Sequence, residues 1–188
     1  MQVKRFFTTL IREFGTTAIL VIAVFAASRL LVQNVQVRGL SMYPTLQNGE
    51  YMLVDTLSYH LHGPNRGDII IFHPPVDHED YVKRVIGLPG ERVEVRQGTV
   101  YINGKALNEP YVRMPHTYSW SAHVVPPGDV FVLGDNRDAS YDSHLWTNSQ
   151  GQAVPFLSES KIIGRAMLSY WPPSDLRFFT APAFAGAK

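Results

Sequence analysis

The chain has 188 residues, no cysteine and a formal net charge of +1 at pH 7. The lack of cysteine excludes a thiolate nucleophile, a disulfide framework and a cysteine-ligated metal site. A charge so close to zero gives no reason to expect a nucleic-acid partner. About 150 residues follow an apolar N-terminal segment, which is enough for one domain with its own core.

The N-terminal segment predicts a helix that crosses a membrane. Residues 14–37 contain one charged side chain, Arg29. A helix of this length rises about 36 Å, enough to span a hydrocarbon core of about 30 Å with a modest tilt. Arg29 lies toward the far end, where its long side chain can reach the interface.

Basic residues before this segment predict its orientation. Lys4, Arg5 and Arg12 precede it, so we expect residues 1–13 in the cytoplasm and the following domain outside. The alternative is a cleaved signal peptide, with the small residues 26–28 as its cleavage site.

A serine follows the apolar segment closely, within Gly39–Leu46. Ser41 comes four positions after Val37, so it stays within about 14 Å of the segment's end and near the outer membrane face. It is either a linker residue or a nucleophile placed to meet membrane-borne substrates. The stretch lacks the second glycine of a G-x-S-x-G elbow. A neutral lysine can activate a serine instead.

The rest of the chain reads as mostly β, with a turn or two of helix expected at residues 57–62 and 158–161. Asn103-Gly104 indicates a type I′ hairpin, and residues 96–99 a second turn. Residues 91–107 therefore look like a small meander. The expected strands are Tyr51–Asp55, Asp68–Phe72, Tyr81–Ile86, Arg92–Arg96, Thr99–Ile102, Val130–Leu133 and Lys161–Tyr170.

Lys83 is the candidate base. It lies in the expected strand with Tyr81 and Val85 on its face, while Arg84 points to the other side. One of the two cations can then be buried and the other exposed. Alternatively, both are surface charges on an edge strand. A buried lysine loses its proton more readily, as a general base requires.

A dense polar run, Gly134–Ser143, follows the strand that ends at Leu133. It lacks the central glycine and terminal glutamate of a calcium loop, so a metal is not expected. Ser140 and its neighbouring carboxylates can instead orient a catalytic group.

Four stretches together resemble the type I (leader) signal peptidases. They are Ser41–Leu46, Arg66–Phe72, Lys83–Gly90 and Gly134–Ser143. The resemblance extends from the apolar segment to about Trp171. It implies a membrane-bound serine endopeptidase with a Ser–Lys dyad, an all-β catalytic core and a small inserted β extension, which we place at residues 91–128.

The resemblance also implies individual roles. Ser41 would be the nucleophile and Lys83 the general base. Ser140 resembles the serine that hydrogen-bonds the lysine, and Asp142 the carboxylate that braces the loop. The Ser41 N–H would be one donor of the oxyanion hole. Gly39, which stands where some members carry a serine whose hydroxyl helps to form the hole, is the candidate position for the second donor, and the choice of that donor stays open.

A second departure from the family is His144, which stands where an arginine is usual. We expect this histidine to replace the arginine only when it is protonated.

The implied substrates are exported preproteins, cut after A-x-A-like small residues, with the lipid bilayer as the other partner. No cofactor, metal or nucleic acid is expected, and the protein would be a monomer. The implied place is a bacterial-type cytoplasmic membrane, with the catalytic domain (residues 38–175) outside. Two alternatives stay open: a membrane-anchored β domain that binds peptides without cutting them, and a specialised relative with one dedicated substrate.

Residues 176–188 are expected to be a frayed tail. Within it, Phe178 and Phe179 are candidates for lipid contact. Residues 183–186 also contain an A-x-A pattern, so self-cleavage after Ala185 is a further hypothesis.

Overall fold

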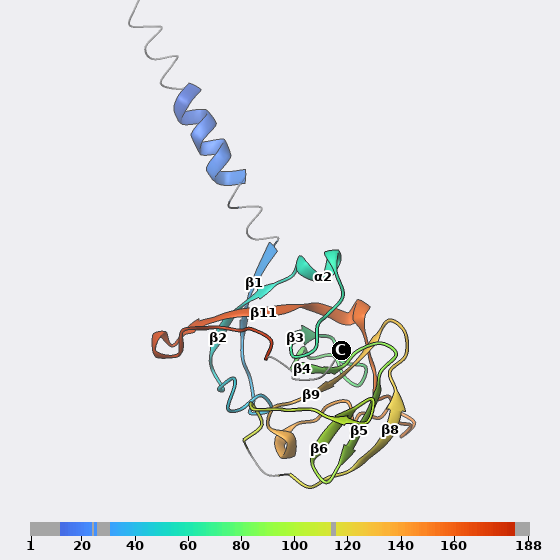
Figure 1. The fold of residues 1–188 in the computed structure, drawn as a ribbon. Coiled ribbons are helices and arrows are strands. Elements are labelled where there is room, and N and C mark those ends of the chain that lie inside the picture. Colours follow the sequence, from blue (N-terminus) through green and yellow to red (C-terminus); the bar gives the residue numbers. More distant parts are fainter. Residues whose placement is uncertain (1–11, 24, 26–30, 114–115, 183–188) are drawn as a thin grey trace, which may run out of the picture.

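The protein is a β domain preceded by a helix, as the computed structural model shows (Figure 1). The structure describes residues 12–23, 25, 31–113 and 116–182. The described strands are β1 (Val32–Gln36), β2 (Tyr51–Asp55), β3 (Ile69–Phe72), β4 (Tyr81–Gly87), β5 (Arg92–Arg96), β6 (Thr99–Ile102), β7 (Lys105–Ala106), β8 (Trp120–Val124), β9 (Asp129–Leu133), β10 (Leu157–Ser158), β11 (Ile162–Trp171) and β12 (Arg177–Phe178). The short helices are α2 (Ser58–Leu61), η1 (Arg137–Ala139), η2 (Glu159–Lys161) and η3 (Pro173–Asp175).

Two antiparallel sheets make up the domain. The larger has the strand order β1-β2-β11-β3-β4-β9-β10, with β12 paired to β11. The smaller has the order β7-β6-β5-β8. The mostly β class is therefore as expected, and the smaller sheet falls within the range proposed for the insertion.

Local turn chemistry explains the smaller sheet. Asn103 and Gly104 have φ values of 51° and 80°, the positive values that a type I′ hairpin requires between β6 and β7. Gln97 and Gly98 have φ values of 45° and 81° between β5 and β6. Both predicted turns are confirmed. Trp120–Val124, which was not predicted as a strand, completes this sheet as β8 by pairing with β5.

A cluster of apolar side chains from β2, β11, β3 and the segment after β1 forms the core beneath Ser41. Val37, Met42 and Leu46 are buried there against Ile69 and Ile71 of β3. This packing holds the segment that contains Ser41 on the inner strands of the sheet, because side chains on either side of the serine are in the core.

The N-terminal segment differs from the expected helix over residues 14–37. Residues 12–23 are helical, but residues 32–36 form β1 and pair with β2. The prediction was wrong at this end because a continuous apolar run is compatible with either a helix or a strand. Within the described ranges, no helix has both the length and the apolar character to cross a bilayer. Residues 1–11 and 26–30, with Lys4, Arg5, Arg29 and the candidate cleavage site, lie outside them.

The C-terminal segment is ordered against the domain rather than frayed at its start. β12 pairs with β11, and Phe179 packs against the core cluster described above. Phe179 is half-buried there, whereas Phe178 is exposed, and the lipid contact of the two residues stays a prediction. The Arg177 guanidinium contacts both carboxylate oxygens of the buried Glu50, at 2.7 and 2.9 Å. The A-x-A pattern at residues 183–186 lies outside the described residues.

Candidate active site

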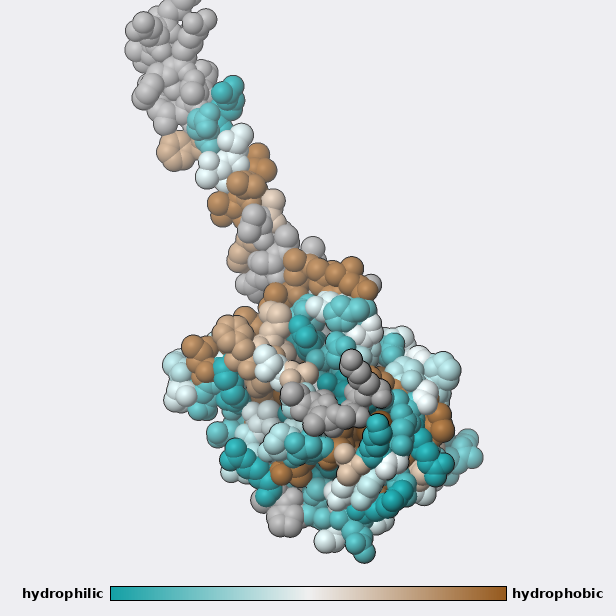
Figure 2. Space-filling model, in the orientation of Figure 1, coloured by the Kyte–Doolittle hydropathy of each residue, from teal (hydrophilic) through white to brown (hydrophobic). Residues whose placement is uncertain are grey.

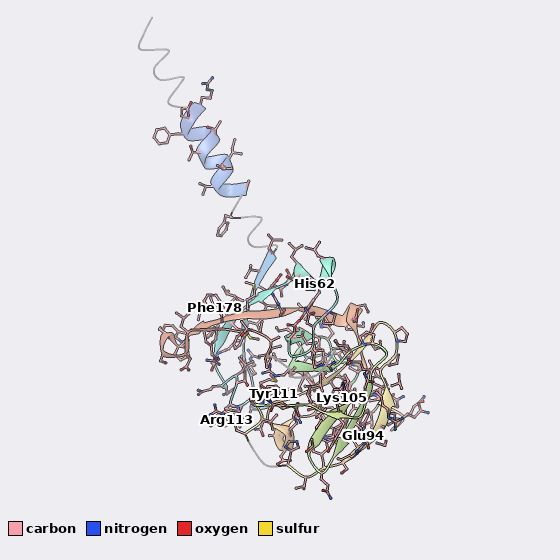
Figure 3. All side chains as sticks on the ribbon, viewed as in Figure 1. His62, Glu94, Lys105, Tyr111, Arg113 and Phe178 are labelled. Carbon is pink, nitrogen blue, oxygen red and sulfur yellow. The ribbon has the colours of Figure 1, made fainter. Side chains whose placement is uncertain are left out.

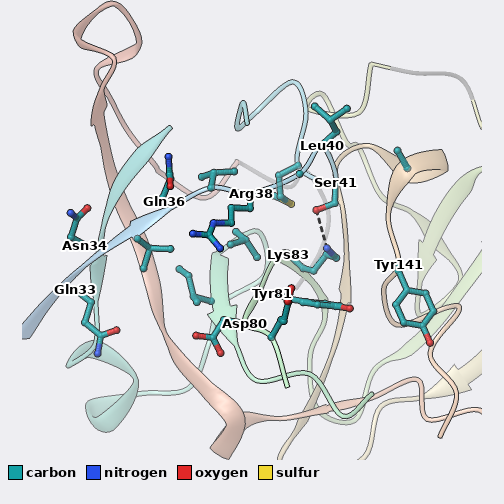
Figure 4. Close-up of a pocket in the computed structure, with 18 residues that line it drawn as sticks. Gln33, Asn34, Gln36, Arg38, Leu40, Ser41, Asp80, Tyr81, Lys83 and Tyr141 are labelled. Atoms are coloured by element: carbon teal, nitrogen blue, oxygen red, sulfur yellow. Dashed lines mark hydrogen bonds between the residues drawn. The ribbon is translucent and has the colours of Figure 1, made fainter. Parts of the chain in front are cut away.

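Ser41 and Lys83 meet at the wall of a cleft (Figure 4). Lys83 Nζ donates a hydrogen bond of 2.9 Å to Ser41 Oγ. Lys83 comes from β4, and Ser41 comes from the turn between β1 and β2. The two residues are 42 positions apart, so the fold of the larger sheet is what brings them together.

Burial changes the acidity of Lys83. Only 4% of this residue is exposed. Burial lowers the pKa of Lys83 to about 8, against an opposing influence from the Asp142 carboxylate. The ammonium loses its solvation in the protein interior, and this favours the neutral amine. A large fraction of the neutral, basic form is therefore present at mildly alkaline pH.

The neighbouring Arg84 is buried as well, on the opposite side of the strand. Its exposed fraction is 3%, so both open alternatives for the two cations were wrong. Arg84 forms a two-bond ion pair with Asp135, at 2.8 Å from Nε and 2.6 Å from Nη2. The Asp135 carboxylate compensates for the burial of the Arg84 charge. Arg84 can therefore stay charged when buried, whereas burial favours the neutral amine of Lys83.

The loop that follows β9 lies directly on the turn that carries Ser41. The Asn136 N–H donates to the Ser41 carbonyl at 3.0 Å, and Asn136 Nδ2 donates to the Leu40 carbonyl at 3.1 Å. Thr45 Oγ1 donates to Asp135 at 2.5 Å. Sequence reasoning missed the role of Asn136, because its partners lie more than 90 residues away and leave no local pattern.

Ser140 belongs to the same loop but does not bond Lys83. Its Oγ is buried and has no hydrogen-bond partner among the described residues, so the expected bond to the lysine is not formed here. The hydroxyl is instead packed against Gly134: a Cβ added at Gly134 would lie 2.2 Å from Ser140 Oγ and 2.5 Å from the Ser41 carbonyl oxygen. Only glycine fits at this crowded point.

Asp142 joins the loop to the strand before it. Its Oδ2 accepts a bond of 2.9 Å from the Gly134 N–H, and its Oδ1 lies 2.6 Å from His144 Nδ1. The His144 ring is stacked on Tyr118, with centroids 4.2 Å apart. A neutral imidazole with its proton on Nδ1 can donate this bond. The contact therefore does not need the charged form that the sequence argument assumed.

Gly39 does not offer the N–H that was expected of it. Its φ is +95°, and its N–H donates to Asn48 Oδ1 at 2.9 Å. The Gly39 assignment as an oxyanion donor is therefore wrong for this arrangement. Within the described part of the chain, the Ser41 N–H donates to no other group, so it is available to a substrate.

The cleft has a volume of about 740 Å³. Its walls come from β1, the turn that carries Ser41, the start of β4 and the loop at Ala139 and Tyr141. No group of three or more His, Asp or Glu side chains in the described residues is arranged to hold a metal ion. A serine hydroxyl bonded to a desolvated lysine at such a wall is the arrangement required by a serine hydrolase that uses a lysine base.

The comparisons with known proteins agree with this class. The chain belongs to the signal peptidase family, peptidase S26, whose family model matches residues 10–171. It is 44% identical over 144 residues to signal peptidase I of Leptolyngbya laminosa, covering 72% of this chain and 67% of that one.

Two further relatives match more of the chain. A probable signal peptidase I-2 of Synechocystis sp. is 38% identical over 178 residues, covering 91% of this chain and 78% of the relative. Signal peptidase I of Bacillus caldolyticus is 38% identical over 172 residues, covering 84% and 90%. A solved signal peptidase I from Enterococcus faecalis aligns with 55% of this chain and 97% of its own at a TM-score of 0.45 and 34% identity, and the family assignment does not rest on it.

Proposed function

We propose that this protein removes N-terminal signal peptides from exported preproteins, with Ser41 as the nucleophile and Lys83 as the general base. The observation that carries the assignment of these roles is the 2.9 Å hydrogen bond from a 4% exposed lysine to the serine hydroxyl. Serine endopeptidase activity agrees with the relatives that bear the name signal peptidase I.

The proposed reaction begins with the neutral form of Lys83. Lys83 Nζ takes the proton of Ser41 Oγ as this oxygen attacks the scissile carbonyl. The resulting ammonium then gives a proton to the leaving amine, and an acyl-enzyme ester remains on Ser41. A water that Lys83 deprotonates attacks this ester and releases the signal peptide with a new carboxylate.

Stabilisation of the oxyanion is assigned to the Ser41 N–H, because the Gly39 N–H is bonded to Asn48. Such donors usually make a large contribution to acyl-transfer catalysis. Asn136 supports the donor indirectly, since its N–H holds the Ser41 carbonyl. Asp142, which accepts a bond from the Gly134 N–H, is proposed as a positioning residue for the loop, and Ser140, which packs against Gly134, as part of the same support.

The substrate is proposed to bind as an extended strand. β1 lies at one end of the larger sheet, and β4 pairs with β9 only from Arg84 onward. Residues 81–83 therefore have a free edge beside the cleft, where a peptide strand can add. Small residues at the first and third positions before the cut would fit the shallow apolar floor near Val35 and Val37.

Membrane association is part of the proposal. Figure 2 shows hydrophobic surface on the helix and on the adjoining end of the domain. Leu31, Leu57 and Leu61 are exposed, and the Thr56 N–H bonds the Leu31 carbonyl, so these side chains gather where the helix joins the domain. We place the catalytic domain, as a monomer, outside a bacterial-type cytoplasmic membrane with the N-terminus inside.

The test uses the full chain and a preprotein with an A-x-A junction. Parent protein should release the mature form, whose N-terminus mass spectrometry identifies, and Ser41→Ala and Lys83→Ala should each reduce the rate at least a thousandfold. Lys105→Ala, on the smaller sheet, is the matched control (Figure 3). Cleavage by both dyad variants at the parental rate would remove the assignment.

The same experiment separates the remaining alternatives. Binding without cleavage by the parent would favour a peptide-binding domain. Cleavage of only one preprotein from a panel would favour a specialised relative.

A further inference from the structure

Among the described residues that line the cleft there is one cation besides Lys83, and it has no ionic partner among them. Arg38 lines the cleft and makes no hydrogen bond or ion pair within the described part of the chain. The anionic residues that line the same cleft are Glu79 and Asp80, and Asp80 is already paired with His73 at 2.6 Å. Figure 4 shows the Arg38 side chain extending into the space between Gln36 and Tyr81.

The backbone holds Arg38 in this position from both sides. The Val37 N–H donates to the Glu50 carbonyl at 2.8 Å, and the Val37 carbonyl accepts from the Gly49 N–H at 2.9 Å. On the other side, the Gly39 N–H is bonded to Asn48. Since Val37 is buried in the core, the next side chain must point away from it. The orientation of Arg38 toward the cleft is thus built into the turn.

This position selects one part of the substrate. Arg38 precedes Ser41 by three positions, so their Cα atoms lie within about 11 Å. An extended peptide rises about 3.3 Å per residue, so Arg38 can meet only the few residues nearest the cut. Val35 and Val37 belong to the floor, whereas Gln36 and Arg38 are exposed on the other side.

Side chains of an extended substrate alternate in the same way. If the first and third residues before the cut face the apolar floor, the second faces Arg38. A guanidinium binds a carboxylate through paired, charge-assisted hydrogen bonds. An acidic side chain at the second position would supply the partner that Arg38 lacks, whereas a basic one would meet a like charge.

We propose that Arg38 is a specificity-determining residue that favours an acidic side chain at the second position before the scissile bond. This inference rests on the proposed peptidase function. It makes the cleft selective for charge at the second position, which the requirement for small residues at the first and third positions leaves unconstrained.

The test compares three peptides that differ only at this second position, where they carry Glu, Gln or Lys between two alanines. The measured quantity is the ratio of kcat/KM for the Glu peptide to that for the Lys peptide, within each enzyme. We expect a ratio of about three to five in the parent, the size of a solvent-accessible ion pair. The ratio should fall to about one in Arg38→Gln and below one in Arg38→Glu.

Controls make the ratio interpretable. Arg38→Lys keeps the charge and should keep a preference for Glu, and added salt should reduce the parental ratio because it screens the pair. Lys105→Gln removes an exposed cation on the smaller sheet and should leave the ratio unchanged. A parental ratio near one, or an equal ratio in parent and Arg38→Gln, would overturn the proposal. If the parent cleaves none of the three peptides, the proposed function fails instead.

Discussion

Replacing Lys83 with methionine should stabilise the fold while it removes activity. Methionine has a similar length and no charge, so it fills the buried space without the cost of desolvating an ammonium. Lys83 is buried, and burial lowers its pKa from 10.5 to about 8 on folding. At about 1.4 kcal/mol for each pKa unit, the burial of the protonated lysine costs about 3 kcal/mol.

The sign of this cost fixes its dependence on pH. Below pH 8 both the folded and the unfolded lysine are protonated, so the full cost is present. Between pH 8 and 10.5 the folded lysine is neutral while the unfolded lysine still binds a proton, so the cost disappears as pH rises. The stability advantage of Lys83→Met should therefore be largest at pH 7 and nearly absent above pH 10.5.

The assay is chemical unfolding of parent and variant in the same detergent at pH 7, 8.5 and 10. At pH 7 the Lys83→Met protein should have a higher free energy of unfolding, by up to about 3 kcal/mol, which corresponds to a gain of roughly 5–10 °C in Tm. Lys105→Met, at an exposed position, is the control and should show no such trend. A variant that is less stable than the parent at pH 7, or a difference that does not change with pH, would refute the reasoning.

Three further substitutions test the packing around the site. Gly134→Ala should abolish cleavage, because its Cβ would lie 2.5 Å from the Ser41 carbonyl oxygen and must displace the turn that carries Ser41. Cleavage at the parental rate would contradict this prediction. Asp135→Asn should lower the free energy of unfolding by about 3–5 kcal/mol, since it leaves the charge of Arg84 buried and unpaired, and denaturant titration measures this loss. Arg177→Gln should also destabilise the protein by a few kcal/mol because its glutamate partner is 1% exposed, and an unchanged midpoint would show that the pair contributes nothing.

Patterns set by near neighbours could be predicted from the sequence. The hairpin at Asn103-Gly104 follows from two residues that tolerate positive φ, and the two strands before it, β5 and β6, alternate in burial. The N-terminal boundary could not be predicted in this way. The run before Val37 has the composition of a spanning helix. Its last residues form β1 instead, because β2 offers hydrogen-bond partners for their backbone groups.

The parts of the site whose residue types are tied to the chemistry could be predicted from the sequence. The parts whose burial and bonding depend on residues far away in the chain could not. Ser41 and Lys83 were candidates from their local sequence and took their roles from the resemblance, and the structure brings them into direct contact. The burial of Arg84 depends on Asp135, which is 51 positions away, and no local pattern announces that pair. The unpartnered hydroxyl of Ser140 is likewise a result of packing against Gly134, which only the three-dimensional arrangement reveals.

The central claim is that neutral Lys83 activates Ser41, and the pH dependence of cleavage tests it most directly. With a pKa of about 8, the neutral fraction of this lysine rises from about one in eleven at pH 7 to about ten in eleven at pH 9. We predict that kcat/KM of the parent on a synthetic signal peptide rises about tenfold over this range, with a midpoint near pH 8, and that Lys83→Ala shows no cleavage. A parental profile that is flat from pH 7 to 9, or a Lys83→Ala protein that cleaves with the parental profile, would contradict the claim.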